Sequence, residues 1–393
     1  MVGHLRRQVE LLESAPETIA GTLRRWSARS LPFRLLAVSA GLLAAGCVRG
    51  CGVERPQPET VIPVAIATDA VSEDADDPAI WINHSQPDAS LILGTNKADS
   101  PGGALVVFGL DGRMRQRVAG LDRPNNVDVE YGLSLGGGPV DVAVVTERNR
   151  RRLRVFVIPP EGTPLVDISS PGGTSVFGGE EGERAAPMGI GLYKRPRDHA
   201  VFAVVSRKAG GPRGYLWQYR LEDDGNGRVR AIKVRELGTT AIGAEVEAVA
   251  VDDANGLVYY AEENRGIHKW HADPAAPGAD HELALFGRRG FQGDREGLAL
   301  YSPAQGGSFL VACDQIKGHS HYLAYARERA QDPPETAPTL VTTVEGGADD
   351  TDGIDATAEP LGSAFPHGML VAMNSSGRNF FIYRWEDLGL DPR

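Results

Sequence analysis

A pattern of three strands recurs six times along the 393-residue chain. Each copy ends in a short hydrophobic stretch with an aromatic residue at its tip, and successive tips lie 48, 63, 51, 55 and 58 residues apart. A period of about 40 to 60 residues is typical of a β-propeller, whose blades are four-stranded antiparallel sheets. The six tips are Phe108, Phe156, Tyr219, Trp270, Tyr325 and Tyr383.

Two more predicted strands precede each aromatic-tipped strand. The first strands lie at 79–81, 127–131, 189–193, 248–251, 298–301 and 354–356. The second strands lie at 91–94, 142–145, 201–205, 257–261, 309–312 and 369–372. An irregular β-sandwich is the alternative, but it gives no reason for one strand order to recur six times. The sequence therefore predicts an all-β fold, a six-bladed β-propeller of four-stranded antiparallel blades, over residues 61–393.

The N-terminus carries an export signal of the bacterial type. Six arginines within residues 1–34 precede an uncharged apolar run, 35–45, which is shorter than the roughly 20 residues that span a bilayer. The run leads to Ala-Ala-Gly-Cys47, which resembles the lipobox of lipoproteins. We predict a signal peptide at 1–46, lipidation of Cys47 and a tether at 47–60, with plain secretion as the alternative. The protein is then exported, as a cell-envelope lipoprotein or a periplasmic or secreted protein, and touches the membrane only through the lipid.

The charge balance narrows the range of partners. The chain has 52 acidic against 41 basic residues, for a net charge of -11. Nucleic-acid binding depends on clustered Lys and Arg that neutralise phosphates, so no nucleic acid is expected as a partner. We expect a monomer.

One mouth of the predicted channel collects the polar residues. Consecutive strands of a blade are antiparallel, so the start of the first strand and the end of the second lie together. First-strand starts carry mainly acids, with two asparagines and one methionine among them. These residues are Asp76, Asp77, Asn125, Asn126, Asp128, Met188, Glu247, Asp294, Glu296, Asp352 and Asp355. Second-strand ends carry the bases Lys97, Arg148 and Lys208 in the first three blades, and the acids Glu262, Glu263 and Asp314 in the next two.

These residue types suggest metal and phosphate chemistry, although each alone is typical of a solvated loop end. Crowded carboxylates need cations, and hard oxygen ligands without paired His or Cys favour several Ca²⁺ ions. Basic side chains beside calcium favour a polyphosphorylated substrate. The expected chemistry is attack of a metal-activated water on phosphorus.

Five motifs of the chain are similar to those of β-propeller phytases. They are Asp74 to Trp81, Thr95-Asn96-Lys97, Asn125-Asn126-Val127-Asp128, Asp294 to Leu298 and Asp350 to Asp355, and the resemblance covers about 66–385. It implies calcium-dependent hydrolysis of phosphomonoesters of myo-inositol hexakisphosphate (phytate), or of other inositol phosphates, taken as calcium complexes. It also implies direct attack by water without a covalent enzyme intermediate.

The resemblance also assigns roles to residues. It implies metal ligands at Asp76, Asp77, Glu247, Glu263, Asp294, Glu296 and Asp352. It implies substrate-binding bases at Lys97, Arg148 and Lys208, which share the catalytic role with Glu296. Two departures stand out, because Met188 occupies the place of a family Tyr, and the loop 345–350 is short and lacks one family aspartate unless Glu345 or Asp349 replaces it.

Two alternative functions and the roles of two sequence segments stay open. A lactonase or esterase propeller typically coordinates a single axial calcium, and a calcium-filled propeller could bind a phosphorylated ligand without turnover. The pair His319 and His321 places both rings on one face of a strand, either as surface residues or in a metal or acid role. Apart from Arg148, the Arg-rich segment 148–154 is expected to form either a surface hairpin or part of the anion site.

Overall fold

The structure is a computed structural model that describes residue 58 and the ranges 60–327 and 332–390. The predicted signal peptide, Cys47 and nearly all of the predicted tether lie outside the described residues. Among the described residues, no helix is long and apolar enough to span a membrane.

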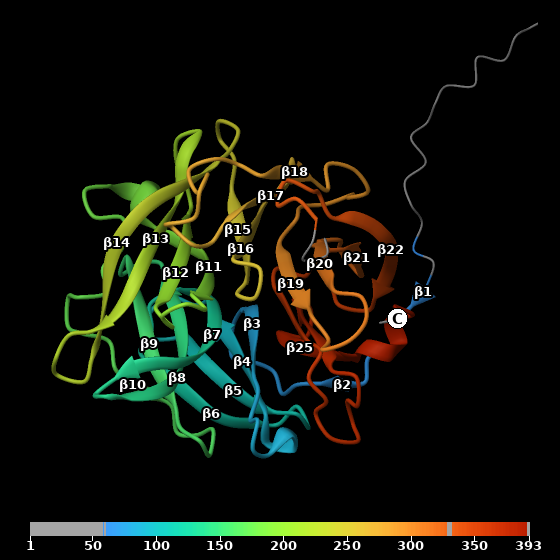
Figure 1. Ribbon diagram of the computed structural model, residues 1–393. Helices are drawn as coiled ribbons and strands as arrows, with labels where there is room; N and C mark the ends of the chain where they lie inside the picture. Colours follow the sequence, from blue (N-terminus) through green and yellow to red (C-terminus); the bar gives the residue numbers. More distant parts are fainter. Residues whose placement is uncertain (1–57, 59, 328–331, 391–393) are drawn as a thin grey trace, which may run out of the picture. The chain divides into compact units, whose positions relative to one another are not determined.

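Six antiparallel sheets surround a central channel, which confirms the predicted propeller (Figure 1). Blade one has β3 (Ala75–Trp81), β4 (Leu91–Asn96), β5 (Ala104–Gly109) and β6 (Met114–Ala119); blade two has β7 (Pro124–Leu135), β8 (Gly138–Glu147), β9 (Arg152–Ile158) and β10 (Val166–Asp167). Blade three has β11 (Pro187–Lys194), β12 (Val201–Arg207), β13 (Arg213–Asp223) and β14 (Val229–Thr239); blade four has β15 (Val246–Asp252), β16 (Leu257–Glu262), β17 (Gly266–His271) and β18 (Ala284–Phe286). Blade five has β19 (Gly297–Tyr301), β20 (Phe309–Asp314), β21 (Ser320–Ala326) and β22 (Thr339–Gly346); blade six has β23 (Ile354–Thr357), β24 (Met369–Asn374) and β25 (Asn379–Arg384).

Blade six takes its outer strand from the other end of the chain. The strand β2 (Ile66–Ala67) pairs antiparallel with β25 and completes four strands. The strand β1 (Thr60–Val61) pairs parallel with β22, so blade five has a fifth strand. This pairing of the N-terminal segment with the last two blades closes the ring of sheets.

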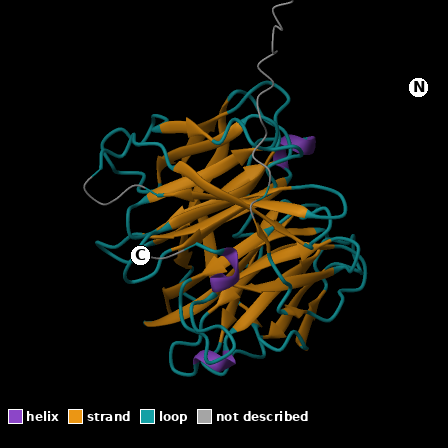
Figure 2. Cartoon of the chain, turned by 90° about the vertical axis from the view of Figure 1, so that its right-hand side faces the viewer, coloured by secondary structure: helices purple, strands orange, loops and turns teal. Residues whose placement is uncertain are grey.

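Helical structure in the described residues is limited to short 3₁₀ turns (Figure 2). These turns are η1 (Pro87–Ala89), η2 (Gly182–Ala185) and η3 (Trp385–Leu388). The strands bury their side chains between neighbouring blades, and all six aromatic tips predicted from the sequence are buried there. The ring centroids of Phe108 and Phe380, from blades one and six, lie 5.9 Å apart, which shows how closely the first and last blades pack.

Candidate functional site

Backbone bulges shape the mouth in the first four blades. The pairing of each inner strand with its neighbour shifts register between Ala75 and Pro78, Pro124 and Val127, Pro187 and Ile190, and Val246 and Val249. A bulge re-aims the side chains at its position and is frequent next to functional sites. The residues within these four irregular steps include Asp76, Asp77, Asn125, Asn126, Met188 and Glu247, which sequence reasoning had placed at the mouth.

Three glutamates from blades four and five meet at the mouth and form what we call the acid triad: Glu247, Glu263 and Glu296. One carboxylate oxygen from each lies within 4.8 Å of the others. Burial, reinforced by neighbouring carboxylates, raises the pKa of Glu263 to about 7 and that of Glu296 well above its ordinary value. The buried Glu296 Oε2 has no hydrogen-bond partner. The triad therefore has the donors and the uncompensated charge that a calcium ion would satisfy.

A second acidic group lies beside Lys97. The Lys97 ammonium pairs with Asp76, and its Nζ lies 3.7 Å from Asp352 Oδ2. Burial raises the pKa of Asp76 to about 6 although Lys97 opposes the shift, and Asp76 Oδ2 is buried without a hydrogen-bond partner. The Gln315 side-chain amide donates to Asp352 Oδ1. One base between two carboxylates leaves this group with a net negative charge, which again fits a cation.

Arg148 connects the basic side of the mouth to the acid triad. Its guanidinium donates to Asn125 Oδ1, and its Nη2 lies 3.8 Å from Glu247 Oε1. The Asn125 amide in turn donates to Glu247, so Asn125 bridges the base and the acid. Met188 is buried, and its Sδ lies against the Arg148 guanidinium. Met188 thus contacts the base that the sequence predicts to bind substrate.

Lys208 lies in a recess next to this network. Arg148 and Lys208 line a hollow of about 390 Å³ together with Arg151. The Lys208 ammonium pairs with Glu245, a partner that sequence reasoning missed. The alternation of Glu245 and Glu247 on either side of Val246 was the only signal for it. The recess combines several positive charges with open space, which suits a phosphate group.

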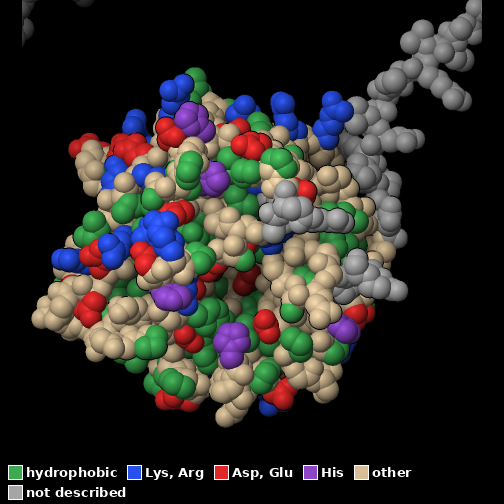
Figure 3. Space-filling model, viewed as in Figure 1, with side chains coloured by type: hydrophobic (Ala, Val, Ile, Leu, Met, Phe, Trp, Pro, Cys, Tyr) green, Lys and Arg blue, Asp and Glu red, His purple; other side chains and the backbone are tan. Residues whose placement is uncertain are grey.

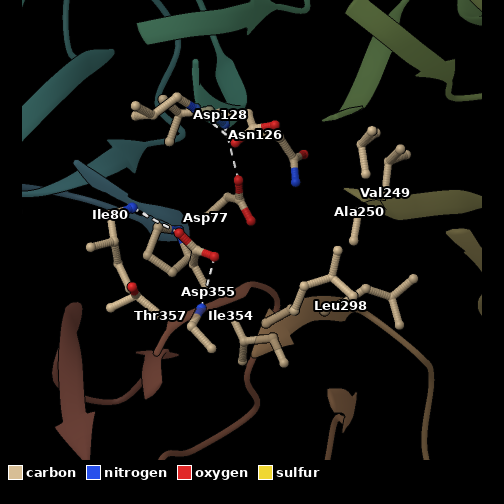
Figure 4. Close-up of a pocket in the computed structure, with 18 of the residues that line it drawn as sticks. Asp77, Ile80, Asn126, Asp128, Val249, Ala250, Leu298, Ile354, Asp355 and Thr357 are labelled. Atoms are coloured by element: carbon tan, nitrogen blue, oxygen red, sulfur yellow. Dashed lines mark hydrogen bonds between the residues drawn. The ribbon is translucent and has the colours of Figure 1, made fainter. Parts of the chain in front are cut away.

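Two of the predicted ligands, Asp77 and Asp294, belong neither to the acid triad nor to the acidic group beside Lys97. Asp294 is exposed at the edge, although its charge helps to raise the pKa of Glu263. Asp77 faces the central channel, where its Oδ2 accepts a hydrogen bond from the Val127 backbone at 3.0 Å (Figure 4).

The channel, of about 370 Å³, has an acidic side and an apolar side. The carboxylates of Asp128 and Asp355 repeat the arrangement of Asp77 and accept backbone N–H groups of Leu192 at 2.6 Å and Ile80 at 2.8 Å. Each of the three carboxylates thereby ties its own inner strand to that of the next blade. The apolar side comes from β15 and β19 with Val249, Ala250 and Leu298 (Figure 4). The space-filling view has a hollow at its centre with acidic side chains inside it (Figure 3).

Two comparisons with known proteins find similar sequences. The sequence model of the phytase family matches residues 34–388. A 3-phytase of Bacillus subtilis (strain 168) is 31% identical over 341 residues, which cover 83% of this chain and 82% of that protein.

Proposed function

This chain belongs to the phytase family and is a phytate-hydrolysing enzyme, and we propose that it uses calcium ions held at the mouth of the propeller. The observation that carries the proposal is the acid triad, whose oxygens converge within 4.8 Å while Glu296 Oε2 lacks a partner. Oxygen-only donors of high negative charge are the ligands that Ca²⁺ prefers. Asp76 and Asp352 would hold further calcium beside Lys97.

Calcium bound there would neutralise the carboxylates and activate the attacking water. The chain's own residues would position the phosphate. Arg148 offers a planar fork that matches two phosphate oxygens, and Asn125 fixes its orientation. Lys97 and Lys208 add point charges on either side. Together these bases would stabilise the negative charge that develops on the equatorial oxygens as the ester bond breaks.

The recess lined by Arg148, Arg151 and Lys208 supports a substrate with more than one phosphate. A phosphate held in the recess would place a neighbouring phosphate of the same inositol ring over the acid triad. Phytate, presented as its calcium complex, satisfies both positions at once. A lactone or a carboxylic ester offers nothing to the basic recess, so the geometry favours the phosphate ester.

The test is phosphate release from calcium phytate by the purified protein, with and without a calcium chelator. We expect release to stop with chelator, and to fall at least about 100-fold in Glu296→Gln and in Arg148→Ala. Arg113→Ala serves as the control, because the Arg113 side chain is 78% exposed on the surface. Undiminished release in chelator would contradict the calcium mechanism, and turnover retained in both variants would contradict the site.

We also propose that the chain is exported and that Cys47 carries a lipid. Intact-mass and N-terminal analysis of the protein from a membrane fraction tests this. A mature chain beginning at lipidated Cys47 is expected, whereas a protein that retains residues 1–46 would contradict it.

A further inference from the structure

A second cluster of ligand atoms lies in blade five and takes no part in the proposed hydrolysis. We call it the rim cluster: His319, His321 and Glu345. One ligand atom of each lies within 4.8 Å of the others. We propose that the rim cluster binds a zinc-class divalent cation through its two imidazoles and one carboxylate.

The register of blade five builds the cluster. His321 on β21 is paired with Glu345 on β22 and with Asp314 on β20, so the three side chains are direct neighbours across three strands. Side chains directly opposite each other in a sheet share one face. His319 lies two residues before His321 and therefore joins the same face, with 5.3 Å between the two ring centroids.

The distances suit ligands around one ion. His321 Nε2 lies 3.8 Å from Glu345 Oε2, which is longer than a well-formed hydrogen bond. Two ligand atoms at about 2.0–2.1 Å from one tetrahedral zinc ion lie about 3.4 Å apart. A closure of a few tenths of an ångström would therefore bring both atoms to one ion. The partly exposed Glu345 and His319 leave an open path for the ion to enter.

Asp314 has the position of a residue that orients the metal ligand. Its Oδ2 lies 3.7 Å from His321 Nδ1, the ring nitrogen that does not face Glu345, so a closure of about half an ångström would be needed to form a hydrogen bond between them. Asp314 is itself held by hydrogen bonds from the backbone N–H groups of Gln292 and Gly293. A carboxylate behind a ligating imidazole fixes its tautomer and ring orientation, and its loss typically costs 10- to 100-fold in metal affinity.

The donor set selects a different ion from that of the acid triad. Imidazole nitrogens suit Zn²⁺ and related ions, whereas Ca²⁺ takes oxygen ligands almost entirely. Three protein ligands leave at least one coordination position for water or another small ligand. Bound metal would cross-link β21, β22 and the turn before β21 next to the 292–296 segment, which carries Asp294 and Glu296 of the mouth.

Titration with Zn²⁺ and Co²⁺ in excess calcium tests the proposal. We expect one Zn²⁺ per chain, and visible Co²⁺ absorption typical of a low-coordinate nitrogen site. The affinity should fall at least 10-fold in His319→Ala and in Glu345→Gln, two partly exposed positions where folding is not at risk. His281→Ala is the matched control, because the His281 side chain is 77% exposed and lies outside the cluster.

Two further variants separate the possible outcomes. Asp314→Asn should weaken Zn²⁺ binding and shift the Co²⁺ spectrum, which a purely structural residue would not do. Zn²⁺ binding that survives in His319→Ala and disappears in Glu247→Gln would place the ion in the acid triad and overturn the proposal. Absence of Zn²⁺ binding above that of a chelator blank would also overturn it. None of these readouts depends on phytate hydrolysis.

Discussion

The acid triad and the rim cluster each bring three ligand atoms together, but their chemistry differs. In each, three ligand atoms lie within 4.8 Å of one another at the ends of propeller strands. The triad offers only carboxylates and is surrounded by further acids, since Asp76, Asp294 and Asp352 all act on its members electrostatically. The rim cluster offers two imidazoles and one carboxylate. The comparison teaches that the fold supplies converging positions, and the residue type at those positions selects the ion.

The largest expected effect is that of Glu247→Gln. The substitution keeps the shape of the side chain but removes one negative ligand of the triad and the partner of Asn125 and Arg148. We expect phytate turnover to fall by about 100- to 1,000-fold, the range seen when a preorganised electrostatic group is lost. Calcium affinity at the mouth should fall with it, while Co²⁺ binding at the rim cluster persists. An equal loss of calcium binding at the mouth and Co²⁺ binding at the rim cluster would show that the two sites are not independent.

Protonation should separate the acidic mouth from the rim cluster in a second way. Burial raises the pKa of Asp76 from 3.8 to about 6, so the folded protein without calcium binds this proton more tightly than the unfolded chain. The resulting stability is complete below about pH 4 and is lost as pH rises through 6. A shift of this size corresponds to about 3 kcal/mol. At the rim, burial lowers the pKa of His321 below its ordinary value of 6.5. The stability that the neutral imidazole contributes is therefore present above pH 6.5 and is lost as pH falls below it.

Urea unfolding in chelator at pH 4 to 8 measures this dependence. Because Asn resembles the protonated carboxyl, the parent protein and Asp76→Asn should be equally stable near pH 4, and the parent should become the less stable of the two as pH rises through 6. Saturating calcium should reverse the trend, because the ion favours the charged carboxylate. A stability difference independent of both pH and calcium would contradict the assignment.

The backbone of Gly189 packs closely against Glu247 of the acid triad. A Cβ on Gly189 would lie 1.7 Å from the backbone oxygen of Glu247, so Gly189→Ala must push β11 and β15 apart. We expect a loss of about 2 kcal/mol in stability and lower calcium affinity. Gly347, two residues after Glu345, is the control, because the nearest atom to its added Cβ is 3.8 Å away. Gly347→Ala should change stability by less than about 0.5 kcal/mol. Equal effects at both positions would refute this difference.

Much of this architecture follows from local sequence patterns. The strand order and the aromatic tips are set by hydrophobic runs, so the six blades could be predicted and are confirmed. The closure of blade six by β2 could not, because it joins residues 66–67 to 381–382 across the whole chain. Two-residue strands also carry too little pattern to be recognised.

The residue types of the site could be predicted from the sequence, whereas their arrangement in space could be predicted only in part. The acids and bases stand at strand ends, where antiparallel geometry brings them to one mouth. The bulges that aim Asp76 and Glu247, and the turn of Asp77 into the channel, depend on pairing register between strands. Residue order does not encode that register directly. The bridge from Arg148 through Asn125 to Glu247 is likewise a contact between blades two and four, which lie far apart in the sequence.

Substitution of Met188 has the smallest expected effect. It tests whether a soft donor takes part in metal selection at the mouth. Its sulfur lies against the Arg148 guanidinium and is a weak acceptor, which calcium does not favour as a ligand. Leucine has a similar volume, so Met188→Leu should fold normally and keep calcium affinity within about twofold. The KM for phytate should rise only about twofold, because Asn125 still holds the guanidinium. A changed preference between Ca²⁺ and Zn²⁺ at the mouth would mean that the sulfur selects the ion there, and the contrast with the rim cluster would then fail.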